Sequence, residues 1–379
     1  MGKIQMVDLV SQYKNIQEEV DNAILNVVGS AAYIRGSEVK GLEEELAAYL
    51  GIKHVITCGN GTDALQISLM ALGLKPGDEV ISASFTFIAT VEVIALLGLK
   101  PVMVDVDPST FNIDPKAIEN AITDKTKAII PVHLFGQCGN MDAIMEVAKK
   151  HDLYVIEDTA QAISAAYTNN NGETKKAGTI GHIGCTSFFP SKNLGCYGDG
   201  GAIFTEDDEI AEMLRMVANH GMKKRYYHEV IGVNSRLDNL QAAVLRIKLR
   251  LLDNYKGARN AVADFYDNAF INMEQLSIPE RNPQSSHAFH QYTLKCNGID
   301  RDGLKDYLAA RDIPSMVYYP VPLHMQDAFI NNPSFKQTSL PITEDLAKKV
   351  ISLPIHTEMK EEQLILITET VKEYINSIS

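Results

Sequence analysis

The sequence predicts an α/β protein with a large domain built on a mostly parallel sheet and a small α+β domain toward the C-terminus. From about residue 40 to 205, short apolar runs rich in β-branched residues alternate with segments of helical period. That alternation is typical of a parallel sheet covered by helices on both faces. After about residue 240 helices dominate and strands are short. We therefore predict a large domain over 1–240, which includes an N-terminal helix, and a small domain over 241–379.

The elements of the large domain are expected to follow one another as strand, then helix. The expected strands are 55–58, 79–82, 101–105, 128–132, 153–157, 185–189 and 202–205, and the expected helices are 62–71, 89–97, 115–122 and 141–149. In the small domain we expect helices over 240–252, 256–268, 303–311 and 361–375, and a strand over 290–295. Ligands of open parallel sheets bind at the carboxyl ends of the strands, and the candidate residues below fall there.

Charge and cysteine content exclude several classes of protein. With 35 basic and 48 acidic residues the formal charge is −13, which argues against nucleic acid or an anionic membrane as the main partner. The five cysteines are odd in number and never spaced as C-x-x-C, so we predict no disulfide framework and no metal site. The N-terminus lacks a signal-peptide apolar region and no run of 18 apolar residues occurs, so we expect a cytoplasmic protein.

The first chemical candidate is Lys192, which follows an apolar strand and precedes a glycine-rich turn. A lysine in that position can be partly desolvated, which lowers its pKa and makes the neutral amine a nucleophile. Nucleophilic amines form Schiff bases with aldehydes. The alternative is an ordinary loop lysine in a tight turn.

The second candidate is the segment that begins at Asp158, the residue that directly follows the expected strand 153–157. A carboxylate at that edge of the sheet could keep a pyridine nitrogen protonated, so that the ring acts as an electron sink. Gln161, three residues further on, could donate a hydrogen bond to a ring oxygen. The alternative is an aspartate that caps the next helix.

Two further segments follow strands in the same way. Gly61 and Thr62 begin a helix, where free backbone N–H groups, the helix dipole and a hydroxyl could bind a phosphate. Phe87 could stack on a flat cofactor, and Ser187 could add a second hydroxyl to the phosphate site. The alternatives are a simple strand–helix turn and a core phenylalanine. Together the four segments match what pyridoxal phosphate requires.

The sequence resembles the DegT/DnrJ/EryC1/StrS family of sugar aminotransferases, which have the aspartate-aminotransferase-like fold type I. The resemblance covers almost the whole chain and is carried by Asn60-Gly61-Thr62-Asp63-Ala64-Leu65, Glu157-Asp158-x-Ala160-Gln161, Ser187-Phe188-x-x-x-Lys192, Gly198-Asp199-Gly200-Gly201 and Asn234-Ser235-Arg236-Leu237-Asp238. It implies a pyridoxal 5′-phosphate enzyme that takes its amino group from glutamate.

The resemblance also implies a role for each matching residue. Lys192 would hold the cofactor as a Schiff base and move the proton, Asp158 would bind the pyridine nitrogen, and Gln161 the ring hydroxyl. Phe87 would stack on the ring. Gly61, Thr62 and Ser187 would bind the phosphate, and Asn234 would reach it from the neighbouring subunit, which implies a homodimer with shared active sites. Relatives that are dehydratases carry histidine in place of the lysine, so Lys192 favours transamination.

The substrate is predicted from a narrower resemblance, to the branch that aminates C3 of UDP-2-acetamido-3-keto-glucuronate in surface-polysaccharide and lipopolysaccharide biosynthesis. Arg236 and Tyr319 match substrate contacts of that branch, whereas Tyr318 stands where the branch has histidine. We expect Arg236 to bind a substrate carboxylate, because a guanidinium can do so with two parallel hydrogen bonds. The alternatives are a structural ion pair for Arg236, a C3 or C4 aminotransferase of a dTDP-keto-deoxyhexose, and a non-catalytic regulator that binds the cofactor.

Overall fold

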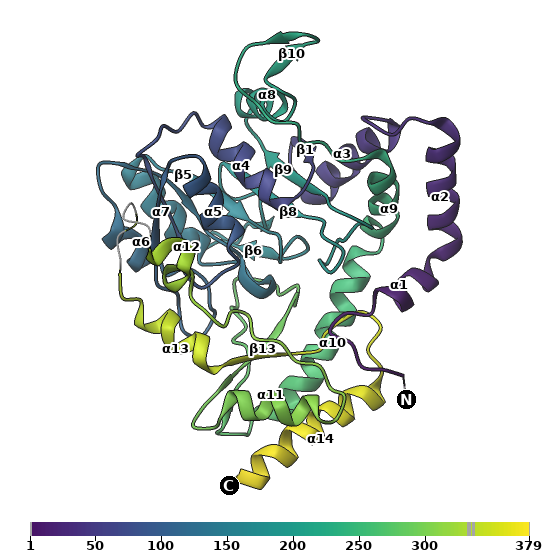
Figure 1. Cartoon of the computed structure of the whole chain (residues 1–379), viewed down its shortest axis with the longest axis vertical. Helices are drawn as coiled ribbons and strands as arrows, with labels where there is room; N and C mark the ends of the chain where they lie inside the picture. The colour runs from purple at the N-terminus through teal and green to yellow at the C-terminus, as the bar shows by residue number, and fades with distance from the viewer. Residues whose placement is uncertain (1, 332–334, 336–337, 379) are drawn as a thin grey trace.

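Two β-sheets, joined by a long helix, organise the chain (Figure 1). The computed structural model describes residues 2–331, 335 and 338–378. The larger sheet has seven strands in the order β1-β9-β8-β5-β4-β2-β3, and the smaller has three in the order β12-β13-β14. Both chain termini lie near the smaller sheet, at the bottom of the view in Figure 1.

The seven-stranded sheet is mostly parallel, as the sequence predicts. Its strands are β1 (His54–Cys58), β2 (Glu79–Ala83), β3 (Lys100–Val104), β4 (Thr126–Ile130), β5 (Tyr154–Asp158), β8 (Ile183–Ser187) and β9 (Gly201–Thr205). Neighbours from β3 to β8 pair in parallel, and only β9 runs against its neighbours β8 and β1. The predicted strand boundaries agree with these to within two residues, because each strand is an apolar run.

Helices cover both faces of this sheet. One face carries α6 (Pro115–Ala121) and α7 (Met141–His151), and the other carries α4 (Gly61–Ala71), α5 (Ala89–Leu96) and α8 (Asp208–Val217). Successive strand residues point to opposite faces. Val155 therefore packs in the first core and Ile156 in the second. This burial on both faces explains why the strands read as continuous apolar runs.

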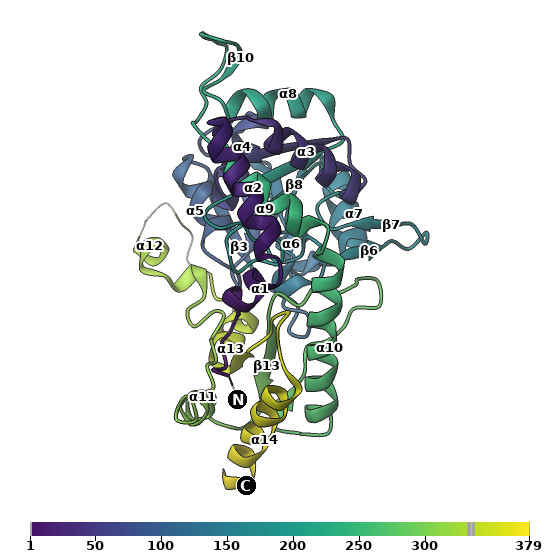
Figure 2. The ribbon, with the colours of Figure 1, turned by 90° about the vertical axis from the view of Figure 1, so that its right-hand side faces the viewer.

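The N-terminal helices pack on the part of the sheet formed by β1 and β9. They are α1 (Leu9–Asn15), α2 (Gln17–Ser30) and α3 (Ser37–Leu50). Leu42 and Leu46 of α3 share a core with Leu245 of α9 (Asn239–Leu249), and Val20 of α2 packs against Val244 of the same helix. Figure 2 shows α2 alongside α9. The predicted domain boundary at 240 falls inside α9, and the division into two domains stays a prediction.

The C-terminal region is built on the antiparallel three-stranded sheet. Its elements are α10 (Leu252–Phe270), β12 (Leu276–Ser277), β13 (Tyr292–Cys296), α11 (Arg301–Ala309), α12 (Asp327–Ile330), α13 (Pro341–Lys349), β14 (Val350–Leu353) and α14 (Glu361–Ile378). Tyr266 and Phe270 of α10 pack with Leu294 of β13 and Ile367 of α14 in one core. The sequence analysis did not find β14, which completes this sheet.

Short elements connect the larger ones. They are the hairpins β6 (Ala166–Thr168) with β7 (Thr174–Lys176) and β10 (Met222–Lys224) with β11 (Tyr227–His228), and the 3₁₀ turns Leu134–Gly136 and Leu323–Met325. All five cysteines are buried and unpaired. Within the described part of the chain, no helix is long and apolar enough to cross a membrane, and no His/Cys/Asp/Glu group is arranged to hold a metal ion.

Candidate active site

A cavity of about 850 Å³ opens where the parallel strands of the large sheet end. Nine of the residues predicted from the sequence line it: Gly61, Thr62, Phe87, Asp158, Gln161, Ser187, Lys192, Tyr318 and Tyr319. They come from segments that follow β1, β2, β5 and β8, and from the loop before the second 3₁₀ turn. The parallel topology therefore gathers the groups between Gly61 and Lys192, and a loop of the C-terminal region adds Tyr318 and Tyr319.

Lys192 lies in the loop after β8, five residues beyond the end of that strand. Its side chain reaches the cavity, and burial lowers its pKa, although the negative charge of Asp158 opposes that shift. Desolvation disfavours the ammonium form of a lysine, so a larger share of the amine is available as a nucleophile.

The loop around Lys192 is fixed on both sides. The Asn193 side-chain amide donates to the carbonyl of Ala288 at 2.8 Å. On the other side, Nζ of Lys248 in α9 donates to the carbonyl of Gly195, also at 2.8 Å. Lys248 is itself buried, and this burial lowers its pKa to about 8. These contacts hold the loop in one position, which limits the directions that Lys192 can take.

Asp158 points into the cavity from the end of β5 and is almost fully buried. Its carboxylate accepts hydrogen bonds from the hydroxyl of Thr90 at 3.1 Å and from the backbone N–H of Ala160 at 3.0 Å. The bond from the N–H of Ala160 is the kind that a capping aspartate accepts, and the same carboxylate also lines the cavity. The structural and the chemical interpretations of this aspartate are therefore compatible.

A buried pair supports Asp158 from behind. The neighbouring Glu157 accepts a hydrogen bond from Nε2 of His133 at 2.8 Å and further bonds from the backbone N–H groups of Gly178, Ile180 and Gly181. Burial raises the pKa of Glu157, but these donors outweigh burial and leave the pKa below its ordinary value. The fully satisfied carboxylate fixes the end of β5 and, with it, the position of Asp158.

Gln161 has a defined orientation. Its Oε1 accepts from the backbone N–H of Phe135 at 2.7 Å, and its Nε2 donates to the hydroxyl of Tyr319 at 3.2 Å. The amide nitrogen therefore faces the cavity side of the residue. A primary amide has two N–H groups, so a second donor remains for a ligand oxygen.

The start of α4 forms the end of the cavity that suits a phosphate. The Asn60 side chain accepts from the N–H of Asp63 at 2.8 Å and so caps the helix. The first N–H groups of a helix have no partner within it, and Gly61 and Thr62 stand at that point. A Cβ at position 61 would lie 2.6 Å from Cβ of Ser187, so only glycine allows this close approach.

Aromatic rings form one wall of the cavity. The ring of Phe87 is 55% exposed, unusual for a large apolar side chain, and it lies 6.4 Å from the ring of Tyr319, centroid to centroid. Burial raises the pKa of Tyr319, so its hydroxyl stays protonated at neutral pH. The exposed Phe87 ring offers a face on which a flat cofactor can stack.

The sequence did not single out several residues that line the cavity or contact its lining. Thr90 orients Asp158, and Thr86 has a buried hydroxyl without a hydrogen-bond partner among the described residues. His290 and Gln291 come from the other end of the chain and also line the cavity. Burial and the nearby charges of Lys192 and Arg259 hold the pKa of His290 well below its ordinary value, so this imidazole is neutral.

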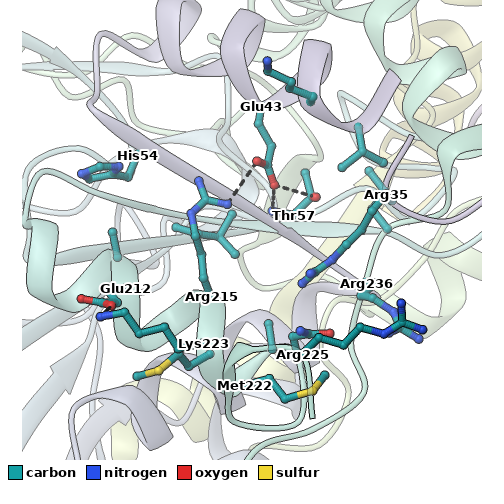
Figure 3. Close-up of a pocket in the computed structure, with 18 of the residues that line it drawn as sticks. Arg35, Glu43, His54, Thr57, Glu212, Arg215, Met222, Lys223, Arg225 and Arg236 are labelled. Atoms are coloured by element: carbon teal, nitrogen blue, oxygen red, sulfur yellow. Dashed lines mark hydrogen bonds and ion pairs between the residues drawn. The ribbon is translucent and has the colours of Figure 1, made fainter. Parts of the chain in front are cut away.

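Asn234 and Arg236 lie elsewhere in the chain's own fold. Neither lines the cavity around Lys192, and Arg236 lines a second one (Figure 3). The hydroxyl of Ser235, between them, donates to the Asp63 carboxylate at 2.6 Å and accepts from the N–H of Gly59 at 2.8 Å. The Ser235 side chain thus attaches the segment to the start of α4, close to the phosphate end, while Arg236 lines the other cavity.

Comparison with protein families identifies the chain. Residues 14–372 match the DegT/DnrJ/EryC1/StrS aminotransferase family. The chain belongs to this family. It is a sugar aminotransferase of the α/β type predicted from the sequence.

Three curated relatives differ in what their names describe. The chain is 47% identical to a pleiotropic regulatory protein of Geobacillus stearothermophilus over 373 residues, that is, over 98% of this chain and 98% of that protein. It is 45% identical to a UDP-2-acetamido-2-deoxy-3-oxo-D-glucuronate aminotransferase of Pseudomonas aeruginosa, over 96% of this chain and 98% of that protein. It is 39% identical to a dTDP-3-amino-3,4,6-trideoxy-alpha-D-glucose transaminase of Streptomyces venezuelae, over 99% of this chain and 97% of that one.

A solved structure supports both the fold and the cofactor. A Bacillus subtilis protein with the bound cofactor PMP has a TM-score of 0.91 and 31% identity, over 99% of this chain and 86% of that one. The enzyme depends on pyridoxal 5′-phosphate. Its cavity suits that cofactor, because it joins a desolvated lysine, a buried carboxylate, an amide donor and a helix start beside an exposed aromatic ring.

Proposed function

We propose that this enzyme transfers the amino group of glutamate to C3 of UDP-2-acetamido-3-keto-glucuronate, in the biosynthesis of lipopolysaccharide or another surface polysaccharide. The observation that carries the proposal is the cavity in which Lys192, Asp158 and Gln161 meet. The 45% identity to the Pseudomonas aeruginosa enzyme, over nearly the full length of both chains, favours this sugar.

Each cavity residue receives one role in the proposal. Lys192 would hold the cofactor aldehyde covalently, Asp158 would bind the pyridine nitrogen, and the free N–H of Gln161 would bind the ring hydroxyl. Gly61, Thr62 and Ser187 hold the phosphate, and Phe87 stacks on the ring. When bound, pyridoxal phosphate supplies an aldehyde and a ring that takes up the electron pair of a broken C–H bond.

The chain's own residues remove and return the proton. With the cofactor bound, the amine of Lys192 would act as the base that removes the proton from Cα of glutamate. The low pKa of Lys192 keeps this amine available as a base. Asp158, held by Thr90 and Ala160, favours a protonated ring nitrogen throughout. In the second half of the reaction Lys192 moves a proton to C3 of the sugar.

A homodimer with shared active sites completes the proposal. Asn234 and Arg236 do not line the Lys192 cavity of their own chain. We propose that they reach the cavity of the second copy, where Asn234 contacts the cofactor phosphate and Arg236 the sugar carboxylate. Tyr318 and Tyr319 contact the same substrate from the cavity wall. The five unpaired cysteines agree with a cytoplasmic location for the enzyme.

A panel of nucleotide sugars tests the substrate. Purified holoenzyme is mixed with glutamate and, separately, with the UDP-3-keto-uronate, its neutral UDP-3-keto-hexosamine analogue, and dTDP-keto-deoxyhexoses. Mass spectrometry then detects the amino sugar. We expect product from the uronate at the highest kcat/KM. A higher kcat/KM with a dTDP sugar would replace the proposal by the dTDP alternative, which the 39% identity to the Streptomyces venezuelae transaminase favours.

A non-catalytic regulator is the second candidate, because one relative of high identity is named as a regulatory protein. Such a protein has no need of a desolvated lysine next to a buried carboxylate. The test is the formation of 2-oxoglutarate from glutamate. Holoenzyme that contains the cofactor but forms no 2-oxoglutarate with any keto sugar would favour the regulator.

A further inference from the structure

A second cavity of about 840 Å³ shares no lining residue with the cofactor cavity. It is formed by the loop before α3, by β1, α8 and the β10–β11 hairpin, and by the segment that contains Arg236. Figure 3 shows four arginines around it. They are Arg35, Arg215, Arg225 and Arg236.

Each acid of this cavity is already paired. Glu43 accepts from Arg215 at 3.2 Å and from the N–H and hydroxyl of Thr57. Asp208 contacts both Lys53 and His54 at 2.6 Å, and Glu212 pairs with Lys223. Each of these carboxylates therefore already has a cationic partner, although Glu43 also attracts Arg35 without forming an ion pair with it.

Of the four arginines that line this cavity, three form no ion pair with a carboxylate among the residues that the structure describes: Arg35, Arg225 and Arg236. Arg225 lies over the ring of Tyr226 instead. Burial and the positive charge of Arg236 lower the pKa of Arg35, which indicates that these two cations repel each other. Unneutralised arginines in a concave site are what an anionic ligand requires, and they stand out in a chain of net charge −13.

The backbone places Arg35 at this point under strain. Its φ is 51°, in the left-handed region that residues other than glycine rarely adopt. The conformation is enforced from both sides, because Ile34 bridges to Asp238 and the N–H of Asn239 donates to the carbonyl of Tyr33 at 2.8 Å. Strained residues of this kind are concentrated at binding and catalytic sites.

We propose that Arg35 joins Arg236 in an oxyanion site for the nucleotide-sugar substrate held in the Lys192 cavity of the second copy, and that Arg35 is a second residue that selects an anionic substrate. The inference rests on the proposed function, which assigns only Arg236 to the substrate. Two guanidinium groups side by side can bind one carboxylate or phosphate through parallel N–H bonds. Two groups on the substrate offer that chemistry, namely the sugar carboxylate and the diphosphate.

Calorimetry of ligand binding to the holoenzyme tells whether the arginines bind the sugar carboxylate or the diphosphate. The probes are UDP-glucuronate, UDP-glucose and inorganic pyrophosphate, and the variants are Arg35→Gly and Arg35→Lys. Glycine adopts the positive φ without strain, so a loss of binding in Arg35→Gly reports the side chain rather than the fold. The control is Arg250→Leu, which removes an arginine of neither cavity that pairs with Glu19.

We expect Arg35→Gly to weaken binding about tenfold or more, Arg35→Lys to weaken it less, and the control to match the wild type. A loss confined to UDP-glucuronate identifies the carboxylate, and a loss with all three probes identifies the diphosphate. Wild-type affinity of Arg35→Gly for every probe, or no binding by the wild type, overturns the inference. Failure of the proposed function looks different: the wild type would bind the probes and yet aminate no keto sugar.

Discussion

The two cavities of this protein differ in the kind of cation that lines them and in whether a carboxylate lies beside it. In the cofactor cavity the cation is Lys192, whose pKa is lowered by burial and which stands near the carboxylate of Asp158. In the second cavity most of the cations are arginines, which stay charged at any accessible pH, and three of them form no ion pair with a carboxylate in the described structure. The first cavity can therefore use an amine that loses and regains a proton, and the second can only attract anions.

The difference follows from the elements that build each cavity. The cofactor cavity lies at the ends of parallel strands, where buried strand residues fix side chains with little freedom. The arginine cavity lies between helices and a hairpin, where long side chains remain partly in solvent. Chemistry that needs a precise position is expected in the first, and recognition of charge in the second.

The largest effect is expected at Lys192. Lys192→Arg retains the positive charge but has no nucleophilic amine, so turnover should fall by about 10⁴-fold or more and the Schiff-base absorbance should disappear. Steady-state kinetics and absorbance spectra measure both. Lys176→Arg is the matched control, since burial also lowers the pKa of Lys176 although it lies outside the cavity. Full turnover in Lys192→Arg would show that this lysine is not the catalytic one.

A smaller effect is expected at Asp158. The Asp158→Asn variant keeps the shape and removes the charge, so the ring nitrogen loses its anionic partner and kcat should fall by about 100-fold. Cofactor binding should change far less than kcat. Asp142→Asn, a change at the start of α7, serves as the control. An unchanged kcat in Asp158→Asn would leave this aspartate only its capping role.

Arg236 should affect substrates selectively. With Arg236→Leu we expect KM for a uronate substrate to rise about tenfold, since a charge-assisted hydrogen bond is lost, while KM for the neutral analogue stays close to that of the wild type. The two KM values are measured on the same preparation. An equal rise for both sugars would refute the carboxylate role.

Thr90 should have a modest effect through Asp158. Thr90→Val removes the hydroxyl that donates to the carboxylate at 3.1 Å and keeps the side-chain volume. We expect kcat to fall about three- to tenfold, the range of one lost hydrogen bond. Thr90→Ser, which retains the donor, should restore most of the activity. If the serine and valine variants had the same kcat, loss of the hydroxyl would not explain the fall in kcat.

Lys248, which supports the catalytic loop, should affect stability in a way that depends on pH. Burial lowers its pKa from 10.5 to about 8 in the folded protein, so between those values the unfolded chain binds more protons and the lysine disfavours folding less as the pH rises. Methionine does not titrate, so the wild type should gain stability relative to Lys248→Met as the pH rises. The unfolding free energy of Lys248→Met minus that of the wild type should therefore decrease by roughly 3 kcal/mol between about pH 7 and pH 10. Denaturant unfolding measures it, with the exposed Lys349→Met as control. A difference independent of pH would contradict the shift.

The sequence predicted the large sheet and the core of the cofactor site well, for a physical reason. Strands buried on both faces are continuous apolar runs, and residues such as Asp158 and Ser187 directly end them. Thr86, Thr90 and His290 escaped because each is a single polar residue whose role depends on packing between distant segments. Arg35 escaped because neither its strained backbone nor the pairing of the surrounding acids is visible in a sequence.

The central claim is that the Lys192 cavity passes an amino group from glutamate to a nucleotide-linked keto sugar, and a two-step single turnover tests it most directly. Holoenzyme is first mixed with glutamate alone, then freed of glutamate and given the UDP-3-keto-uronate. We predict about one 2-oxoglutarate per subunit in the first step, with loss of the Schiff-base absorbance, and about one amino sugar per subunit in the second, with its return. A first step without 2-oxoglutarate, or a second step without amino sugar from any keto sugar of the panel, would contradict the claim.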